Sequence, residues 1–190
     1  ATEAGFQNLS AAGKVCSDMV GIDAVVSQAA LTPGLKWLCI DTLDMLLWQI
    51  EDSVIREAHE KTLNSGTLAY GKGRALTRQM FRGLLSRISS SRYSRLILGH
   101  GRQVEDGGTK RWVPSCADEE VREILLSTVD IIGFARLDRR LVAGKPTDAR
   151  VVEWGASTEW EAGDRTGRLP AQTPRNWAVI SKSLEPKQEA

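Results

Sequence analysis

Two short apolar runs in the sequence have the length and composition of buried strands. The first covers residues 35–40, Leu-Lys-Trp-Leu-Cys-Ile, which follow the turn signal Thr32-Pro33-Gly34 and end at Asp41. The second covers residues 94–99, Ser-Arg-Leu-Ile-Leu-Gly, and ends at His100. We therefore predict two strands, each with a polar residue at its carboxyl end.

Between these runs, apolar residues recur at helical spacing. Leu43, Leu46 and Ile50 share one face of an amphipathic helix predicted over residues 42–59, and a second such helix is predicted over residues 74–90. The order strand, helix, helix, strand is typical of parallel strands covered by helices. The predicted fold class is α/β, with a mostly parallel central sheet flanked by helices.

The rest of the chain has mixed patterns, in which glycine, proline and charged residues interrupt the apolar positions. The predicted segments are a mobile loop over residues 101–110, a helix over 117–127, a strand over 129–137, a C-terminal β-ribbon through Val142 and Val151 to Trp154, an irregular stretch over 159–170, a helix over 174–184 and a flexible tail over 185–190. The length of 190 residues predicts a single domain over residues 1–184.

Composition narrows the class of protein but not its partners. Apolar residues make up 42% of the chain, charged residues make up 26%, and the formal net charge is +1, as in ordinary soluble proteins. The three cysteines are widely spaced, which predicts reduced thiols rather than disulfides or a zinc site. No apolar run has the length of a membrane span and no export signal is visible, so we predict a cytoplasmic protein without a membrane partner.

The stretch Gly66-Thr-Leu-Ala-Tyr-Gly71-Lys72-Gly73 resembles a phosphate-binding loop, G-x-x-x-x-G-K followed by Ser or Thr, but it has glycine at the position of the hydroxyl residue. A working phosphate loop lies between a buried strand and a helix, whereas the residues before Gly66 are polar. We therefore interpret the stretch as a loop between two helices, in which the glycines permit positive φ angles.

The polar residues at the predicted strand ends are candidates for nucleotide chemistry. Asp41 matches the aspartate that orients magnesium and its water in nucleotide hydrolases, although Asp41 or Thr42 would equally serve as a helix cap. His100 could contact a phosphate or polarise water, or be an ordinary loop residue. Glu3 is a candidate general base if a strand precedes it, and otherwise an exposed acid.

Basic residues gather on the helix predicted after the glycine-rich stretch. Arg74, Arg78 and Arg82 recur every four residues and form one stripe, which could follow a nucleic-acid backbone or pair with acidic residues elsewhere. Arg165 and Arg168 lie in a glycine-containing loop that could supply a guanidinium to a phosphoryl group, within one subunit or across an interface, or form surface ion pairs. Trp112 is a candidate for stacking on a base.

Several ordered motifs together resemble one protein family. They are Thr-Glu-Ala-Gly at residues 2–5, Leu-Cys-Ile-Asp-Thr-Leu-Asp at 38–44, Tyr-Gly-Lys-Gly-Arg-Ala-Leu at 70–76, Leu-Ile-Leu-Gly-His at 96–100, Ser-Thr-Val-Asp-Ile-Ile-Gly-Phe-Ala at 127–135, Asp-Arg-Thr-Gly-Arg-Leu-Pro at 164–170 and Pro-Arg-Asn-Trp at 174–177. In this order they resemble the phage-associated AAA-type ATP-binding proteins with a RecA-like core, over nearly the whole chain.

The resemblance implies a role for each strand-end residue. Asp41 would be associated with magnesium, Glu3 would activate water, and His100 would sense the γ-phosphate. Thr42 would help to bind ATP, and Arg165 and Arg168 would make finger-like contacts. The resemblance places the phosphate loop upstream of residues 2–5, so we expect a chain that lacks its N-terminal segment.

The predicted function is that of a RecA-like phage ATPase that uses Mg²⁺ and ATP, is complete only with the upstream segment, and acts on single-stranded DNA in recombination or replication. A homo-oligomer is a possible assembly. Two alternatives stay open: a non-catalytic module that binds single-stranded nucleic acid through the arginine stripe, and a truncated piece without independent activity.

Overall fold

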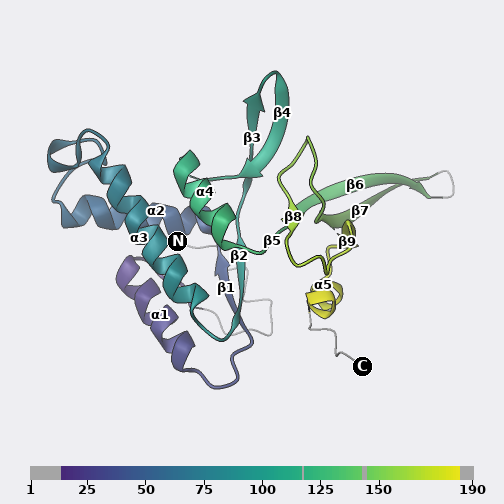
Figure 1. The fold of residues 1–190 in the computed structure, drawn as a ribbon, viewed down its shortest axis with the longest axis horizontal. Coiled ribbons are helices and arrows are strands. Elements are labelled where there is room, and N and C mark those ends of the chain that lie inside the picture. The colour runs from purple at the N-terminus through teal and green to yellow at the C-terminus, as the bar shows by residue number, and fades with distance from the viewer. Residues whose placement is uncertain (1–13, 117, 143–144, 185–190) are drawn as a thin grey trace. The chain divides into compact units, whose positions relative to one another are not determined.

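The computed structural model describes residues 14–116, 118–142 and 145–184, and Glu3 lies outside them. The chain divides into two compact units, one formed by Ala1–His100 with Pro114–Thr128 and the other by Gly101–Val113 with Val129–Ala190. The first unit is α/β and the second consists mainly of β-strands, as Figure 1 shows. The single domain over residues 1–184 stays a prediction.

The first unit contains the parallel strands and most of the helices. Its elements are α1 (Met19–Leu31), β1 (Trp37–Asp41), α2 (Leu43–Glu57), the 3-10 helix η2 (Gly66–Leu68), α3 (Lys72–Ser89), β2 (Ser94–Leu98) and α4 (Glu119–Thr128). Strands β1 and β2 pair in parallel, with Trp37 opposite Ser94 and Asp41 opposite Leu98. The two strands and the helices α2, α3 and α4 confirm the predictions for these segments, apart from small shifts at their ends.

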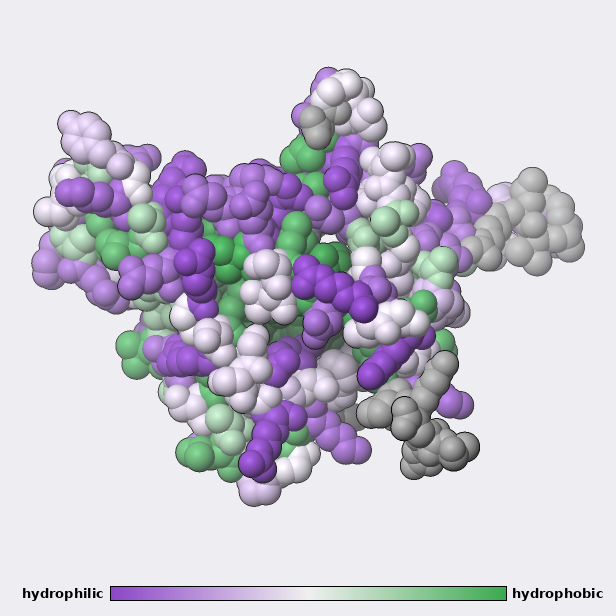
Figure 2. Space-filling model, in the orientation of Figure 1, coloured by the Kyte–Doolittle hydropathy of each residue, from purple (hydrophilic) through white to green (hydrophobic). Residues whose placement is uncertain are grey.

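The core of the first unit lies among its helices. Helices α2 and α3 pack side by side, and α4 packs against α3 (Figure 1). Ile50, Phe81 and Val121, one from each of these helices, are fully buried. Because the apolar positions recur at helical spacing, each helix buries one stripe and exposes its charged face. Hydrophilic side chains consequently occupy much of the visible surface in Figure 2.

The second unit consists mainly of antiparallel strands. Its elements are β3 (Gly101–Asp106), β4 (Thr109–Pro114), β5 (Ile131–Ile132), β6 (Phe134–Val142), β7 (Lys145–Glu153), β8 (Gly163–Asp164), β9 (Gln172–Pro174) and α5 (Trp177–Leu184). The pair β6–β7 forms a long ribbon (Figure 1), to which β9 adds a third strand. The C-terminal β-ribbon predicted from the sequence is therefore confirmed.

Two expectations need correction, and one helix was missed. The described residues do not show a mostly parallel central sheet, because only β1–β2 is parallel and the pairs β5–β8, β6–β7 and β7–β9 are antiparallel. The loop predicted over residues 101–110 consists of the strands β3 and β4, joined at Gly107 and Gly108, whose positive φ angles allow a tight hairpin turn. Helix α1 was not predicted. Within the described residues, no helix is long and apolar enough to cross a membrane.

The glycine-rich stretch before α3 is a loop that connects α2 to α3. Gly71, with a φ of 82°, is the N-cap residue of α3, and the 3-10 helix η2 precedes it instead of a strand. A Cβ atom on Gly73 would lie 2.3 Å from the carbonyl oxygen of Leu63. Gly73 therefore lets the first turn of α3 pack directly against the preceding loop, and the structure agrees with the interpretation of an inter-helix loop.

This packing predicts opposite effects for alanine at two glycines of α3. Gly73→Ala should destabilise the fold by about 1–3 kcal/mol, because the new methyl group overlaps backbone atoms. Gly83→Ala should stabilise it by about 0.5–1 kcal/mol, because Gly83 has open space around it and alanine favours a helix. Urea unfolding of both variants tests this, and equal effects would contradict the close approach at Gly73.

Candidate functional site

The carboxyl ends of β1 and β2 bring together the residues that the sequence singled out. Asp41 is the last residue of β1, and its register partner Leu98 is followed by Gly99 and His100. Because the strands are parallel, both ends lie at the same edge, where open α/β sheets bind their ligands. The side chain of Asp41 is exposed at this edge.

The carboxylate of Asp44 joins the two strand ends. Its Oδ1 accepts a hydrogen bond from the backbone N–H of His100 at 3.2 Å, and its Oδ2 lies 2.7 Å from Nδ1 of His100. Thr42 Oγ1 also donates to Oδ2, at 3.1 Å. Thr42 is the N-cap residue of α2, but its hydroxyl makes no bond to the helix backbone. Thr42 therefore occupies the helix-cap position, as one of the two predicted alternatives, but its hydroxyl donates to Asp44.

A glycine permits this close approach. A Cβ atom on Gly99 would lie 3.2 Å from Cβ of Leu43 and 3.8 Å from Oδ1 of Asp44, so a larger residue would push the end of β2 away from α2. Leu43 is almost completely buried and anchors the first turn of α2 at this point. Asp44 lies in that first turn, where a negative charge also interacts favourably with the helix dipole.

The hydrogen bonds set the charge of Asp44. Partial burial raises the pKa of its carboxyl group, but the hydrogen bonds from the His100 side chain and backbone, together with that from Thr42, outweigh this effect and lower the pKa. Asp44 is therefore a carboxylate at neutral pH. Its contact with Nδ1 fixes the orientation of the His100 ring, 67% of whose side chain is exposed.

The oxygen donors at this edge suit a hard cation held largely through water. Asp41 supplies an exposed carboxylate, and Thr42 and Asp44 supply further oxygen atoms. Magnesium usually binds through one or two carboxylates, with water and phosphate oxygens completing its coordination. Within the residues that the structure describes, no three His, Cys, Asp or Glu side chains cluster as metal ligands. The association of Asp41 with magnesium through water stays a prediction.

Arg165 and Arg168 lie in the second unit, on a turn built around Asp164. Oδ1 of Asp164 accepts a hydrogen bond from the backbone N–H of Thr166 at 2.8 Å, and Oδ2 accepts one from that of Leu169 at 2.8 Å. Burial raises the pKa of Asp164, but these bonds and that from the Thr166 hydroxyl lower it overall. The ordered turn leaves both arginines exposed. Their role as finger-like residues stays a prediction.

The arginine stripe on α3 has acidic neighbours. Arg78 bonds to Oδ2 of Asp118 at 3.2 Å and to Oε2 of Glu120 at 2.7 Å. Arg74 is close enough to lower the pKa of Glu51, whose burial has the larger, opposite effect. Arg82 lines a surface hollow that also contains Glu120 and Glu123. Much of the positive charge is thereby balanced within the first unit, and the role of Arg74, Arg78 and Arg82 in nucleic-acid binding stays a prediction.

Asp44 is the member of this group that sequence reasoning did not select. Its helical spacing placed it on the polar face of α2, and nothing in that pattern distinguishes a solvated carboxylate from one that binds a neighbouring strand. The useful signal was its position, three residues after the strand-end Asp41 and in the first turn of a helix.

The pKa shift predicts that Asp44 stabilises the fold in a pH-dependent way. A carboxyl group whose pKa is lower in the folded chain contributes stability above its unfolded pKa, and this contribution is lost as the pH falls through the folded pKa. Asp44→Asn should therefore lower the free energy of unfolding at pH 7 by about 1–2 kcal/mol, with the difference narrowing toward about pH 3.

Thermal unfolding of wild type and variant across this pH range provides the measurement. Asp52→Asn is the matched control, because Asp52 lies on the same helix and pairs with Arg56 at 2.8 Å at the surface. The control should change stability by less than about 0.5 kcal/mol at any pH. A pH-independent loss in Asp44→Asn would show that the shape of the side chain matters and its charge does not.

The sequence was compared with protein families, curated proteins and solved structures, and only the comparison with families gave a match. No curated protein and no solved structure matches the chain. The AAA domain family matches residues 1–166, a range that includes Asp41, Asp44, His100 and Arg165 and ends before Arg168. AAA-type domains generally bind ATP with Mg²⁺, in agreement with the oxygen donors at the strand ends. Because the match covers most of its length, the chain belongs to the AAA domain family, whose members are P-loop NTPase-type domains.

Proposed function

We propose that this chain is the core of a RecA-like ATPase that hydrolyses ATP with Mg²⁺ and serves DNA recombination or replication in a phage, within the host cytoplasm. The observation that supports this most directly is the contact of Asp44 with His100, which orders the histidine at the carboxyl edge of the parallel strand pair where β1 ends at Asp41. An ordered histidine and an exposed aspartate at such an edge match what a nucleoside triphosphate and its cation require.

Each residue at the edge then has a distinct task. Asp41 would hold a hydrated magnesium ion, which would neutralise charge on the phosphates. The His100 ring, held by Asp44 through Nδ1, contacts the γ-phosphate and distinguishes ATP from ADP. Thr42 keeps the Asp44 carboxylate in place through its hydroxyl. Asp44 is thus a positioning residue, because it acts through His100.

The remaining tasks fall to residues whose placement relative to this edge is not determined. Glu3 is the proposed base that activates the attacking water, and it lies outside the described residues. Arg165 and Arg168 are proposed to stabilise charge on the transferred phosphoryl group, either in the same subunit or in a homo-oligomer. The stretch before α3 is a loop between helices, so it is not proposed as the phosphate loop. The phosphate loop is proposed to come from a segment upstream of residues 2–5.

The alternative of a non-catalytic module relied on the arginine stripe. Because Arg78 already pairs with two carboxylates, its substitution would disturb the contact between α3 and α4 as well as any bound nucleic acid. Loss of binding in such a variant would therefore not identify a nucleic-acid site. The ATPase proposal has the clearer structural support, since Asp41, Asp44 and His100 lie at the carboxyl ends of one parallel strand pair.

The proposal predicts that hydrolysis depends on the Asp41 carboxylate. Asp41→Asn should slow magnesium-dependent ATP hydrolysis by about a hundredfold or more, because the amide does not carry the charge that orients the hydrated cation. Phosphate release would be measured with and without single-stranded DNA, on this chain and on one extended upstream to a start codon.

Asp52→Asn is again the control, because it removes a carboxylate of α2 that lies away from the strand ends. It should leave hydrolysis unchanged. Hydrolysis that survives Asp41→Asn, or the absence of hydrolysis in both the original and the extended chain, would refute the proposed activity.

A further inference from the structure

Three aromatic rings gather in the second unit. The rings of Phe134 and Trp160 are stacked, with centroids 5.6 Å apart and planes only 8° from parallel. Trp112 lies 6.1 Å from Phe134 at an interplanar angle of 36°. Together with neighbouring residues these rings line an open hollow of about 700 Å³. We call it the aromatic hollow.

Backbone pairing holds the rings in place. The N–H of Trp112 donates to the carbonyl oxygen of Glu159, and the N–H of Glu161 donates to that of Trp112, both at 2.8 Å. These bonds attach β4 to the segment that carries Trp160. Gly101 also lines the hollow, and a Cβ atom there would lie 3.3 Å from the Trp112 ring. The absence of a side chain at this position keeps the face of the hollow open.

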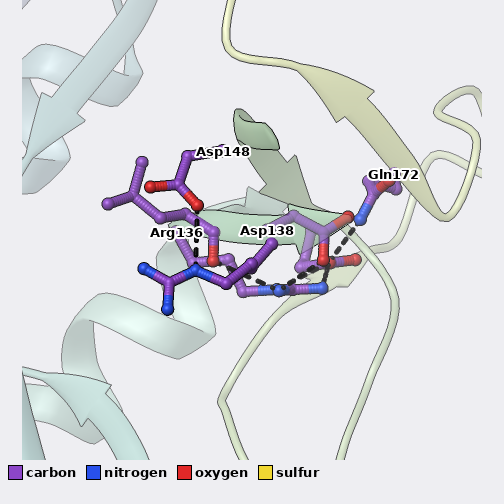
Figure 3. Close-up of polar contacts among 7 residues, drawn as sticks. Arg136, Asp138, Asp148 and Gln172 are labelled. Atoms are coloured by element: carbon purple, nitrogen blue, oxygen red, sulfur yellow. Dashed lines mark hydrogen bonds and ion pairs between the residues drawn. The ribbon is translucent and has the colours of Figure 1, made fainter. Parts of the chain in front are cut away.

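A cation is already fixed against the stacked rings. The Arg136 guanidinium carbon lies 5.4 Å from the centre of the Trp160 ring. Arg136 is held by Glu153 at 2.7 Å and by Asp138 at 3.1 Å, and Gln172 donates to the same Glu153 oxygen at 2.7 Å (Figure 3). Burial lowers the pKa of Arg136, but these bonds raise it overall, so the charge is permanent.

The rim of the hollow carries groups suited to a flat ligand with an anionic backbone. Gln103 on β3 and Lys110 on β4 line it with exposed side chains. Gly101 and Gln103, like Lys110 and Trp112, are two residues apart along a strand and so share a face. Glu159 is the one acidic residue that lines the described hollow.

From this arrangement we propose that the aromatic hollow binds single-stranded DNA by stacking bases on Trp112 and the neighbouring rings. The Trp112 side chain is well placed for this, because the residue is 38% exposed while Phe134 and Trp160 are partly buried behind it. A cationic ligand is disfavoured because the Arg136 guanidinium already lies over the Trp160 ring. Bases of any sequence stack on aromatic side chains, and Lys110 can neutralise a phosphate.

The inference deepens the proposed action on DNA and rests on it for the choice of DNA over RNA. It also moves the expected contact from the arginine stripe of α3, where Arg78 is paired with Asp118 and Glu120, to the β-rich unit. Base stacking explains why three large rings lie around an open hollow instead of closing into a core.

The test measures the affinity of the 190-residue chain for a fluorescently labelled oligo(dT), without nucleotide, by fluorescence anisotropy. Trp112→Ala should weaken binding about tenfold or more, and Trp112→Phe should restore most of it, because phenylalanine retains a stacking face. Glu159→Gln should tighten binding modestly by removing a negative charge that faces the phosphates. Trp48→Ala is the matched control, because Trp48 is 54% exposed on α2 in the other unit, and it should have no effect.

Several results would overturn the inference. They are oligo(dT) binding that Trp112→Ala leaves within twofold of wild type, the absence of any binding, and equally tight binding of free thymidine monophosphate, which would indicate a mononucleotide site. Asp41→Asn separates this inference from the ATPase proposal. Normal DNA binding with lost hydrolysis in Asp41→Asn supports both, whereas hydrolysis without Trp112-dependent binding refutes only the aromatic site.

Discussion

The candidate nucleotide edge depends on a single carboxylate, that of Asp44. Two strands that end side by side do not by themselves order the loops that follow them. Asp44 supplies the missing constraint, because its two oxygens receive the backbone N–H and approach the ring Nδ1 of the same residue, His100. The helix that begins after β1 is thereby tied to the loop after β2, and Gly99 leaves the space for that contact.

Specific partners also hold several arginines among the helices of the first unit. The arginines of α3 lie on an exposed face, yet Arg78 reaches the acidic start of α4 and Arg87 pairs with Asp23 of α1. Arg95 donates to the carbonyl oxygens of Ile88, Ser89 and Ser91 at the end of α3. Positive charge that looks available in the sequence is thus used to connect helices and to satisfy a helix end.

The second unit is ordered in a different way, because its strands are antiparallel and few apolar side chains cover its ribbon. Arg136, Glu153 and Gln172 form a hydrogen-bonded group across three strands, while Trp112, Phe134 and Trp160 gather beside it. Polar and aromatic side chains therefore order this part of the fold together. The result is a surface on which Trp112 stays exposed beside the stacked rings of Phe134 and Trp160.

The sequence by itself determined β1, β2, α2, α3 and α4 of the first unit, because these elements follow regular periods of apolar residues, but it missed α1. It also identified Asp41 and His100 as strand-end residues. It also indicated the ribbon, but it missed the hairpin over residues 101–114, whose turn glycines read as a loop. Only the tertiary structure decided that Asp44 binds His100, that the α3 arginines have acidic neighbours, and that three distant aromatic residues meet. Those contacts join residues far apart in the chain, and periodicity carries no information about which polar groups become partners.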